Sequence, residues 1–387
     1  MKSLAISSLK PNSLYSGYLY LDESYILSTP ETPVTESLLK RLKTWQISEI
    51  QAEETAADES FVPEEHKVYD EQPADESEDG QAREETQKFY TALLEFTHKL
   101  YDTFLKKSTI SIEPLIDQVK ALIALYKKNR RFLLRLSELD RSGFSYIIGH
   151  SVNVAILAIA LGDALKLPSH KMIELGMAGL LHEIGMFKLP DTFQNANRAL
   201  TEPERRALTA HPILGYRILK ELGLNPNVTL AVLEHHEKED GTGYPQGLTG
   251  DKIALSAKIL SVASAYDAQI SLRPYRVARS GHASLMDLLK DIRKTYDDQI
   301  LKRLVFALSL YPLGSFLELK NGAYAVVYDT SSIDPKHPIL KVLTDEHKVP
   351  LVNAPTVQLA DRPELDILRV LSADEVRRLR ADKVLTV

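Results

Sequence analysis

The sequence predicts a mainly α-helical bundle, with a small α/β unit before it and a small β-rich domain after it. Through the middle of the chain, apolar residues recur at three- and four-residue steps, as they do on one face of a helix. An acidic, proline-containing segment separates this part from the first 50 residues. Beyond Tyr311-Pro312 the pattern changes to short strand-like runs with turn residues between them.

Residues 1–50 are predicted to form the α/β unit. The stretch YSGYLYLDESYILS, residues 15–28, alternates well enough for a β-hairpin that turns at residues 22–24. Residues 32–45 carry leucines on one stripe, and Thr32 or Thr35 can cap the helix that this stripe predicts.

Residues 51–85 are predicted to be an acidic linker, disordered or loosely helical. From Glu53 to Glu85 there are fourteen acidic residues against Lys67 and Arg83, with few large apolar side chains. The whole chain has a net charge of −6, so the remainder carries a small positive surplus. That surplus suits an anionic small ligand and is too weak to indicate a surface for a nucleic-acid polymer.

Helical patterning begins at about Thr86, as a lead-in over residues 86–137, and continues to about residue 300. Thr201 and Glu204 have the spacing of a capping box at the start of one helix. The amphipathic stretch 88–105 is expected to pack on the core, with dimerisation as the alternative. In residues 312–387, Asn321-Gly322 between two strand-like runs predicts a hairpin, and residues 337–352 resemble further strand.

The chain has no cysteine, which excludes disulfides and thiolate metal sites. It has no apolar run of 18 or more residues, and its first residues lack the apolar segment of a signal peptide. A cytoplasmic protein without membrane contact is therefore expected.

Five of the eleven histidines, all in the helical middle of the chain, are candidate ligands, and Glu183 directly follows one of them. A single histidine on an apolar helix is most often a satisfied core residue. A group is different, because imidazole and carboxylate are the ligands that manganese, iron or zinc take when thiolates are absent, and helices of one bundle can bring them together. The five are His150, His182, His211, His235 and His236.

A glycine-rich loop follows the adjacent histidine pair, HHEKEDGTGYPQGLTG over residues 235–250. Glycines allow a loop to approach a ligand closely. Tyr244 within it offers a flat ring for stacking on a base, plus a hydroxyl. The alternative is a connecting loop whose tyrosine packs on the bundle.

Residues from about Asp140 to Arg276 resemble an HD-GYP domain, a branch of the HD phosphohydrolase superfamily that hydrolyses the bacterial second messenger cyclic di-GMP. The matching pieces stand in family order: GHSVNVA, LLHEIGMFKLPD, LTEPERRALTAHPILGYRIL, HHEKEDGTGYPQGLTGDKIALSAKIL and YDAQISLRPYR. The resemblance implies an HD-superfamily helical bundle over residues 138–300, and the flanking regions resemble those of some HD-GYP proteins more loosely.

The resemblance also implies a metal-dependent site for cyclic di-GMP. Family members hold two, sometimes three, metals, usually iron or manganese, which activate a bridging water for attack on the phosphodiester. Carried over, His182 and Glu183 are the catalytic pair and Tyr244 lines the nucleotide pocket. Arg273 and Arg276 match basic positions near the ligand phosphates; their alternative is a solvated loop. The implied metal ligands are His150, His182, Glu183, His211, His235 and His236.

Several positions depart from the family pattern. The acid after the histidine is Glu183 where the family has Asp, and Met186 replaces a lysine. Ser264 stands in place of a late Asp ligand, and Tyr146 replaces the glutamate linked to a third metal. A third metal is therefore not expected, and Asp267 is not expected to substitute for the missing acid.

These departures predict one well-formed metal site rather than two. Glu183 and three of the histidines can complete the first site. The second site depends on His150, His182 and the same glutamate, and it lacks the carboxylate of the late Asp. The histidines of the first site are His211, His235 and His236.

The sequence leaves three functions open. The first is a cyclic di-GMP phosphodiesterase, weakened or lost through Glu183, Met186 and Ser264. The second is a catalytically inactive protein that binds cyclic di-GMP or acts as a scaffold. The third, an HD-type hydrolase of another nucleotide, is disfavoured by the intact GYP loop. The acidic tether and flanking domains fit a signalling protein with a protein partner, and an oligomer is possible.

Overall fold

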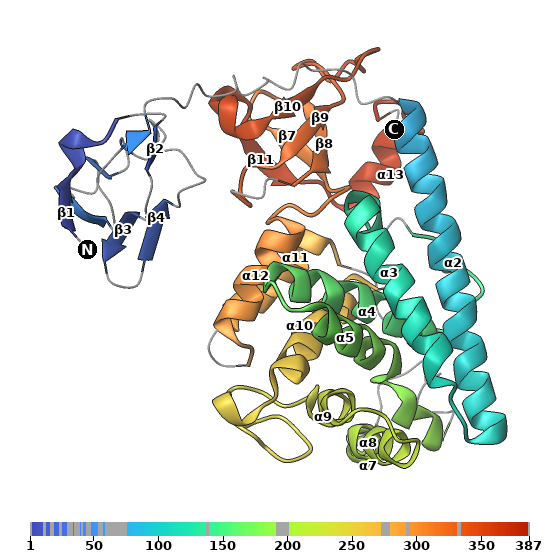
Figure 1. The fold of residues 1–387 in the computed structure, drawn as a ribbon. Helices are drawn as coiled ribbons and strands as arrows, with labels where there is room; N and C mark the ends of the chain where they lie inside the picture. The colour runs from blue at the N-terminus through green and yellow to red at the C-terminus, as the bar shows by residue number, and fades with distance from the viewer. Residues whose placement is uncertain are drawn as a thin grey trace. The chain divides into compact units, whose positions relative to one another are not determined.

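The computed structural model contains two compact units, Met1–Gln72 and Pro73–Val387 (Figure 1). Not every residue of these units is described. The described residues are 2–10, 13–15, 19–22, 25–28, 34, 39, 42–43, 48–52, 57–58, 76–136, 139–190, 201–271, 279–291, 295–330 and 334–385.

The first unit contains an antiparallel four-stranded sheet around a small apolar core. The predicted hairpin is confirmed, because Leu19 pairs with Ser28 and Asp22 with Tyr25. The predicted helix over residues 32–45 lies largely outside the described residues. The sheet has the order β1 (Lys2–Ala5), β5 (Glu49–Ala52), β3 (Leu19–Asp22), β4 (Tyr25–Ser28), and β2 (Leu14–Tyr15) pairs separately with β6 (Ala57–Asp58).

The last part of the acidic segment is helical. Helix α2 spans Glu76–Lys107 and so begins well before Thr86, the start that the apolar pattern predicts. Carboxylates of its first turns pair with basic residues of α3 (Ile112–Leu133): Asp79 with Arg131, and Glu85 with Lys128. Residues 59–75, the middle of the predicted linker, lie outside the described residues.

The second unit is mostly helical, as the sequence predicts. Helix α7 begins with the predicted capping box, in which the side chains and backbone of Thr201 and Glu204 satisfy each other. After α2 and α3 the helices are α4 (Tyr146–Ala164), α5 (Ser169–Leu181), α7 (Glu202–Leu208), α8 (His211–Glu221), α9 (Pro226–Glu234), α10 (Leu255–Ile270), α11 (Gly281–Lys290) and α12 (Asp298–Leu308), with the 3₁₀ turns η2 (Ile184–Lys188) and η3 (Gly250–Lys252).

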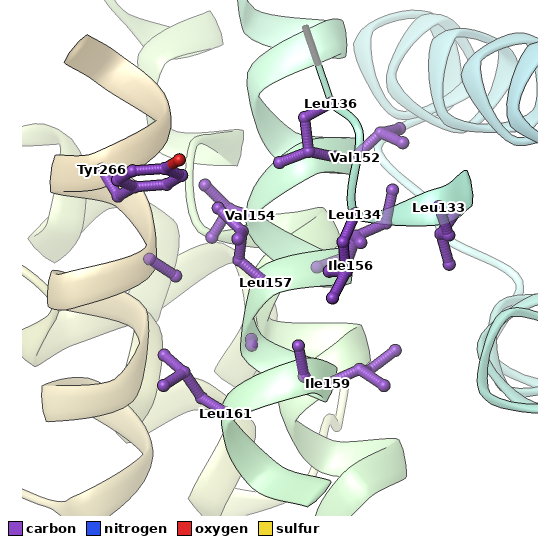
Figure 2. Packing of buried hydrophobic residues seen from close by; sticks show 14 of the residues in the cluster. Leu133, Leu134, Leu136, Val152, Val154, Ile156, Leu157, Ile159, Leu161 and Tyr266 are labelled. Atoms are coloured by element: carbon purple, nitrogen blue, oxygen red, sulfur yellow. The ribbon is translucent and has the colours of Figure 1, made fainter. Parts of the chain in front are cut away.

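Helix α4 forms the centre of the bundle. It is apolar nearly all round, and such a helix is stable in water only when it is enclosed. In Figure 2, Val154 and Leu157 face Tyr266 of α10, whereas Val152 and Ile156 face Leu134 after α3. By length and composition α4 could cross a membrane, but 89% of it lies inside the bundle, which identifies it as a core helix.

The C-terminal part is a five-stranded antiparallel sheet with one helix. The hairpin at Asn321-Gly322 is confirmed, and Gly322 adopts a φ of +94° that favours glycine. Strand residues such as Leu317 and Val327 belong to the core cluster of the bundle, so sheet and helices share one core. The order is β10 (Thr356–Gln358), β9 (Ile339–Val342), β8 (Tyr324–Asp329), β7 (Phe316–Leu319), β11 (Ile367–Val370), followed in sequence by α13 (Ala373–Ala381).

The contact between α4 and α5 is tight enough to predict the effect of one methyl group. A Cβ at Gly179 would lie 2.5 Å from the Cα of Ala155, a backbone atom that cannot move alone. We expect Gly179→Ala to lower the free energy of unfolding by about 1–3 kcal/mol. Urea unfolding followed by circular dichroism measures this.

The matched control is Gly80→Ala in α2, where an added Cβ meets nothing within 4 Å. That variant should be neutral or up to about 1 kcal/mol more stable, because alanine favours the helix. Equal unfolding midpoints for the Gly179 variant and the unmodified protein would contradict the close packing described here.

Candidate metal centre

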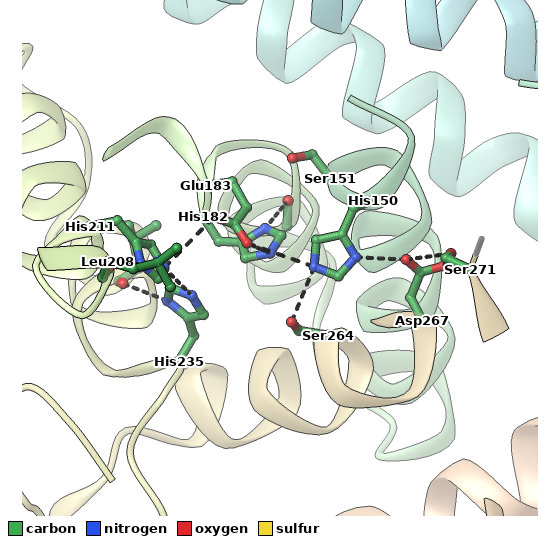
Figure 3. A network of polar contacts seen from close by, with 12 residues as sticks. His150, Ser151, His182, Glu183, Leu208, His211, His235, Ser264, Asp267 and Ser271 are labelled. Carbon is green, nitrogen blue, oxygen red and sulfur yellow. Dashed lines mark hydrogen bonds and ion pairs between the residues drawn. The ribbon is translucent and has the colours of Figure 1, made fainter. Parts of the chain in front are cut away.

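The structure brings the five predicted histidines and Glu183 together inside the bundle (Figure 3). His150 lies on α4, and His182 and Glu183 directly follow α5. His211 begins α8, and the histidine pair directly follows α9. Residues on or directly after four helices thus bring candidate ligand atoms to one centre.

Three of the imidazoles are oriented by the helix turn that precedes them. Nδ1–H of His182, His211 and His235 donates to the carbonyl three residues earlier, each over 2.8 Å. Carbonyls at a helix end have no partner within the helix and are free to accept. With Nδ1 occupied in this way, the lone pair of Nε2 faces the centre, which is the arrangement of metal-binding histidines.

His150 is oriented by a carboxylate instead. Its Nδ1 lies 2.6 Å from Oδ2 of Asp267, which is fully buried. Asp267 also accepts hydrogen bonds from Asn153 and Ser271. The sequence did not reveal this role. Asp267 therefore lies behind the imidazole, on the side away from Nε2, and takes no ligand position beside Ser264.

The ligand atoms fall into two groups of three, each within 4.8 Å: one from His211, His235 and His236, the other from His150, His182 and Glu183. The glutamate reaches both. Its Oε1 lies 3.9 Å from Nε2 of His150 and 3.8 Å from that of His182, and its Oε2 lies 3.7 Å from Nε2 of His211. One oxygen thus faces each group, although the side chain is one methylene longer than Asp.

The geometry of this centre fits cations. Nε2 of His211 and Nε2 of His235 are 3.3 Å apart, and both rings already donate through Nδ1, so two lone pairs face each other. A cation bound to both Nε2 atoms at about 2.0–2.1 Å, the usual zinc–histidine distance, would hold these two nitrogens about 3.0–3.4 Å apart. Nε2 of His182 and Oε2 of Glu183 are also buried without a hydrogen-bond partner. These residues could hold metal.

The protonation states suit this use. Burial lowers the pKa of His182 to about 4 and the pKa values of His235 and His236 well below the ordinary 6.5. Burial would raise the pKa of Glu183, but electrostatic interaction with the surrounding imidazoles, His211 first, lowers that pKa to about 2. Neutral imidazoles and an ionised carboxylate are the forms that bind metal.

Two of the substituted positions, Ser264 and Tyr146, contact His150. Ser264 is buried, and its Oγ lies 3.2 Å from Nε2 of His150, so an uncharged hydroxyl faces that nitrogen. Met186 is buried. Lys188 does not replace the lysine missing there, because its Nζ lies over the ring of Phe104, 5.3 Å from the centroid. Tyr146 stacks on His150 with 5.2 Å between ring centroids.

The GYP loop is tied to the centre through a buried glutamate. Glu237 accepts the backbone N–H groups of Gln246 and Leu248, over 2.6 and 2.9 Å. Tyr244 donates its N–H to the carbonyl of His236 and stacks on that imidazole, 4.7 Å between centroids. The sequence pattern did not reveal the role of Glu237, although the residue directly follows the histidine pair. Arg273 and Arg276 lie outside the described residues.

Comparison with known proteins gives consistent matches. Residues 119–300 match the HD domain family. The chain is 34% identical over 237 residues to the cyclic di-GMP phosphodiesterase PdeB of Borreliella burgdorferi, covering 61% of this chain and 62% of that protein. It is also 34% identical over 245 residues to a cyclic di-GMP phosphodiesterase of Pseudomonas aeruginosa, covering 63% and 58%.

A 3'3'-cGAMP-specific phosphodiesterase of Vibrio cholerae is 36% identical over 169 residues, which is 43% of this chain and 36% of that protein. The chain spans less than two thirds of the length of these three relatives.

The buried histidines predict how stability depends on pH in the metal-free protein. The pKa of His182 is about 4 in the folded state and about 6.5 in the unfolded chain, so the unfolded chain binds the proton first. Stability should therefore fall as pH drops below 6.5, by an amount on the order of 2 kcal/mol at pH 5 for this residue. Glu183 does not contribute to the pH dependence of stability above pH 4.5, because its carboxylate is ionised there in both states: its pKa is about 2 in the folded protein and about 4.5 in the unfolded chain.

The free energy of unfolding is measured by urea unfolding at several pH values with a chelator present, and its slope against pH is the readout. His182→Gln should make this slope smaller between pH 6.5 and 4.5. The control is His98→Gln, an exposed histidine on α2, which should leave the slope unchanged. Parallel slopes for all three proteins would contradict the prediction.

Proposed function

Because residues 119–300 match the HD domain family and the chain is similar to two cyclic di-GMP phosphodiesterases, we propose that the protein belongs to the HD-GYP branch, binds cyclic di-GMP and hydrolyses it in a metal-dependent reaction with reduced turnover. One observation carries this proposal: the Glu183 carboxylate presents one oxygen to each group of histidines. The substrate is proposed from the activity in the names of the relatives.

The centre would hold iron or manganese, the metals that the family resemblance implies. Such cations, when bound, lower the pKa of a water molecule and neutralise charge that develops on a phosphate. The better-formed site would use Glu183 with the histidines of α8 and those after α9. The second site would be weaker, because Ser264 supplies no charge beside His150.

The residues around the centre have separate roles in this proposal. Tyr244 would present its ring to a guanine base, held in place by its contact with His236 and by the loop that Glu237 anchors. Burial raises the pKa of the Tyr244 hydroxyl, so it remains a hydrogen-bond donor. Arg273 and Arg276 remain predicted partners of the phosphates.

Reduced turnover follows from the substituted positions. Met186 offers no charged donor to a phosphate where the family has lysine. Ser264 leaves the group around His150 and His182 with the shared Glu183 as its one carboxylate among the described residues. Loss of a residue that only supports a metal ligand typically costs about 10- to 100-fold in metal affinity or activity, and loss of a ligand should cost at least as much.

The same serine favours the alternative function, a protein that binds cyclic di-GMP without cleaving it. A receptor needs the nucleotide contacts, which are retained at Tyr244, and does not need two complete metal sites. A signalling partner, an oligomeric assembly and a cytoplasmic location stay predictions in either case.

Turnover distinguishes the two functions. The protein, loaded anaerobically with iron or manganese, is incubated with cyclic di-GMP or with 3'3'-cGAMP, and the products are separated by chromatography. We expect slow formation of the linear dinucleotide or GMP from cyclic di-GMP, abolished in His182→Ala. Absence of product from folded, metal-loaded protein that still binds cyclic di-GMP in equilibrium dialysis would establish the receptor instead.

Restoring the acid at position 264 is the second test. Ser264→Asp should raise the metal content per chain and increase turnover by about tenfold or more, because a carboxylate replaces a hydroxyl 3.2 Å from Nε2 of His150. Ser264→Asn is the matched control, equal in size but uncharged. If the Asp and Asn variants have the same metal content and the same turnover, position 264 does not limit this centre.

A further inference from the structure

A cavity lies in the second unit and is lined by residues other than those of the candidate metal centre. It has a volume of about 210 Å³ and lies where the end of α3 meets the segment before β7 and the end of β8. Leu313 and Asp329 contribute to its lining. The other main lining residues are basic: Lys127, Lys128, Arg130 and Arg131.

A bend in α3 places the two arginines. Asn129 has non-helical backbone angles, φ −123° and ψ 34°, and its Nδ2 donates to the carboxylate of Glu85 on α2 over 2.9 Å. Beyond the bend, Nη2 of Arg130 donates to the carbonyl of Ala307 at the end of α12 over 2.8 Å. The guanidinium of Arg131 lies 4.2 Å from the centroid of the Tyr328 ring on β8. The bend thus turns both side chains toward the sheet and α12.

The cations of this cavity are only half neutralised. Lys128 pairs with Glu85 over 2.7 Å, and Arg131 pairs with Asp79. Among the described residues, Lys127 and Arg130 have no carboxylate within ion-pair distance.

Two further features describe the polarity of the lining. Nε of Arg130 is buried without a hydrogen-bond partner, which costs free energy. Asp329 is the one acidic residue of the lining, and its Oδ1 already accepts the N–H of Thr330. The lining therefore carries a net positive charge in a partly enclosed space, where attraction to an anion is less screened than on an open surface.

We propose that this cavity binds a phosphate group, with Lys127 and Arg130 as its counter-charges. Guanidinium and ammonium groups are the usual protein partners of phosphate. The volume lies below the roughly 300–1,000 Å³ of pockets that enclose drug-sized ligands, so it suits inorganic phosphate, pyrophosphate or the phosphate of a mononucleotide, but not a whole cyclic dinucleotide. The ligand would link α3 to the sheet.

Titration of the metal-free full chain tests this site, because removal of metal excludes phosphate bound to cations in the histidine cluster. Pyrophosphate, GMP and guanosine are added in separate calorimetric titrations, and the midpoint of thermal unfolding is followed in parallel. We expect saturable binding of pyrophosphate, a higher midpoint and no binding of guanosine. Binding of GMP as well would identify mononucleotides as a further source of the phosphate.

Lys127→Gln is the first variant, because this lysine is exposed and can be changed without disturbing the core. It should weaken pyrophosphate binding by about tenfold, the usual effect of losing one charged hydrogen bond. Lys120→Gln on the same helix is the matched control. That lysine is also exposed, pairs with Asp117 over 3.5 Å, is not among the lining residues, and should leave the affinity unchanged.

Absence of saturable pyrophosphate binding, or equal affinity in Lys127→Gln and the unmodified protein, would overturn the proposal. Binding of guanosine as tightly as GMP would overturn it too, because the base and not the phosphate would then be recognised. Turnover of cyclic di-GMP is not a readout here, so this test is independent of the proposed activity.

Discussion

The candidate metal centre depends on the orientation of its imidazoles, four of which are held in place through the ring nitrogen Nδ1. Three rings are fixed by carbonyls at helix ends and one by Asp267. Helix ends can converge in this way only if the backbones approach closely. A Cβ at Gly185 would lie 2.0 Å from the carbonyl oxygen of His211, so glycine permits η2 to lie against the start of α8. That contact brings Glu183 next to His211.

The same local geometry explains how a glutamate can serve here. Glu183 is followed by the 3₁₀ turn η2, and its carboxylate lies between the two groups of histidines rather than beyond them. Ser264 has no comparable compensation, since its hydroxyl reaches Nε2 of His150 but brings no charge. The substitutions are therefore unequal: the change at 183 preserves charge and position, whereas the change at 264 removes an anion. That difference is the basis for our proposal that one metal site is stronger than the other.

Local patterns predicted much of this structure, and the contacts between distant residues explain what they missed. The hairpin at Asn321-Gly322 and the capping box at Thr201 follow from neighbouring residues alone. The early start of α2 depends on Asp79 pairing with Arg131, a partner 52 residues away that only the fold brings near. Likewise, Asp267 orients a histidine 117 residues away, and an acidic residue on an apolar helix gives no sign of which partner it will meet.

Helix α2 connects the acidic segment to the metal centre through buried hydrogen bonds. Tyr90 donates to Oδ1 of Asn153 over 2.8 Å, Asn153 donates to Asp267 over 2.7 Å, and Asp267 holds His150. Eleven residues further along α2, Tyr101 donates to the carbonyl of Leu180, two residues before His182. Both tyrosines are fully enclosed, so a shift of α2 would leave buried polar groups unpaired, at about 1–3 kcal/mol each, or would move these groups with it. The position of helix α2, which begins inside the acidic segment, and the orientation of the imidazoles in the candidate metal centre are therefore linked by direct contacts.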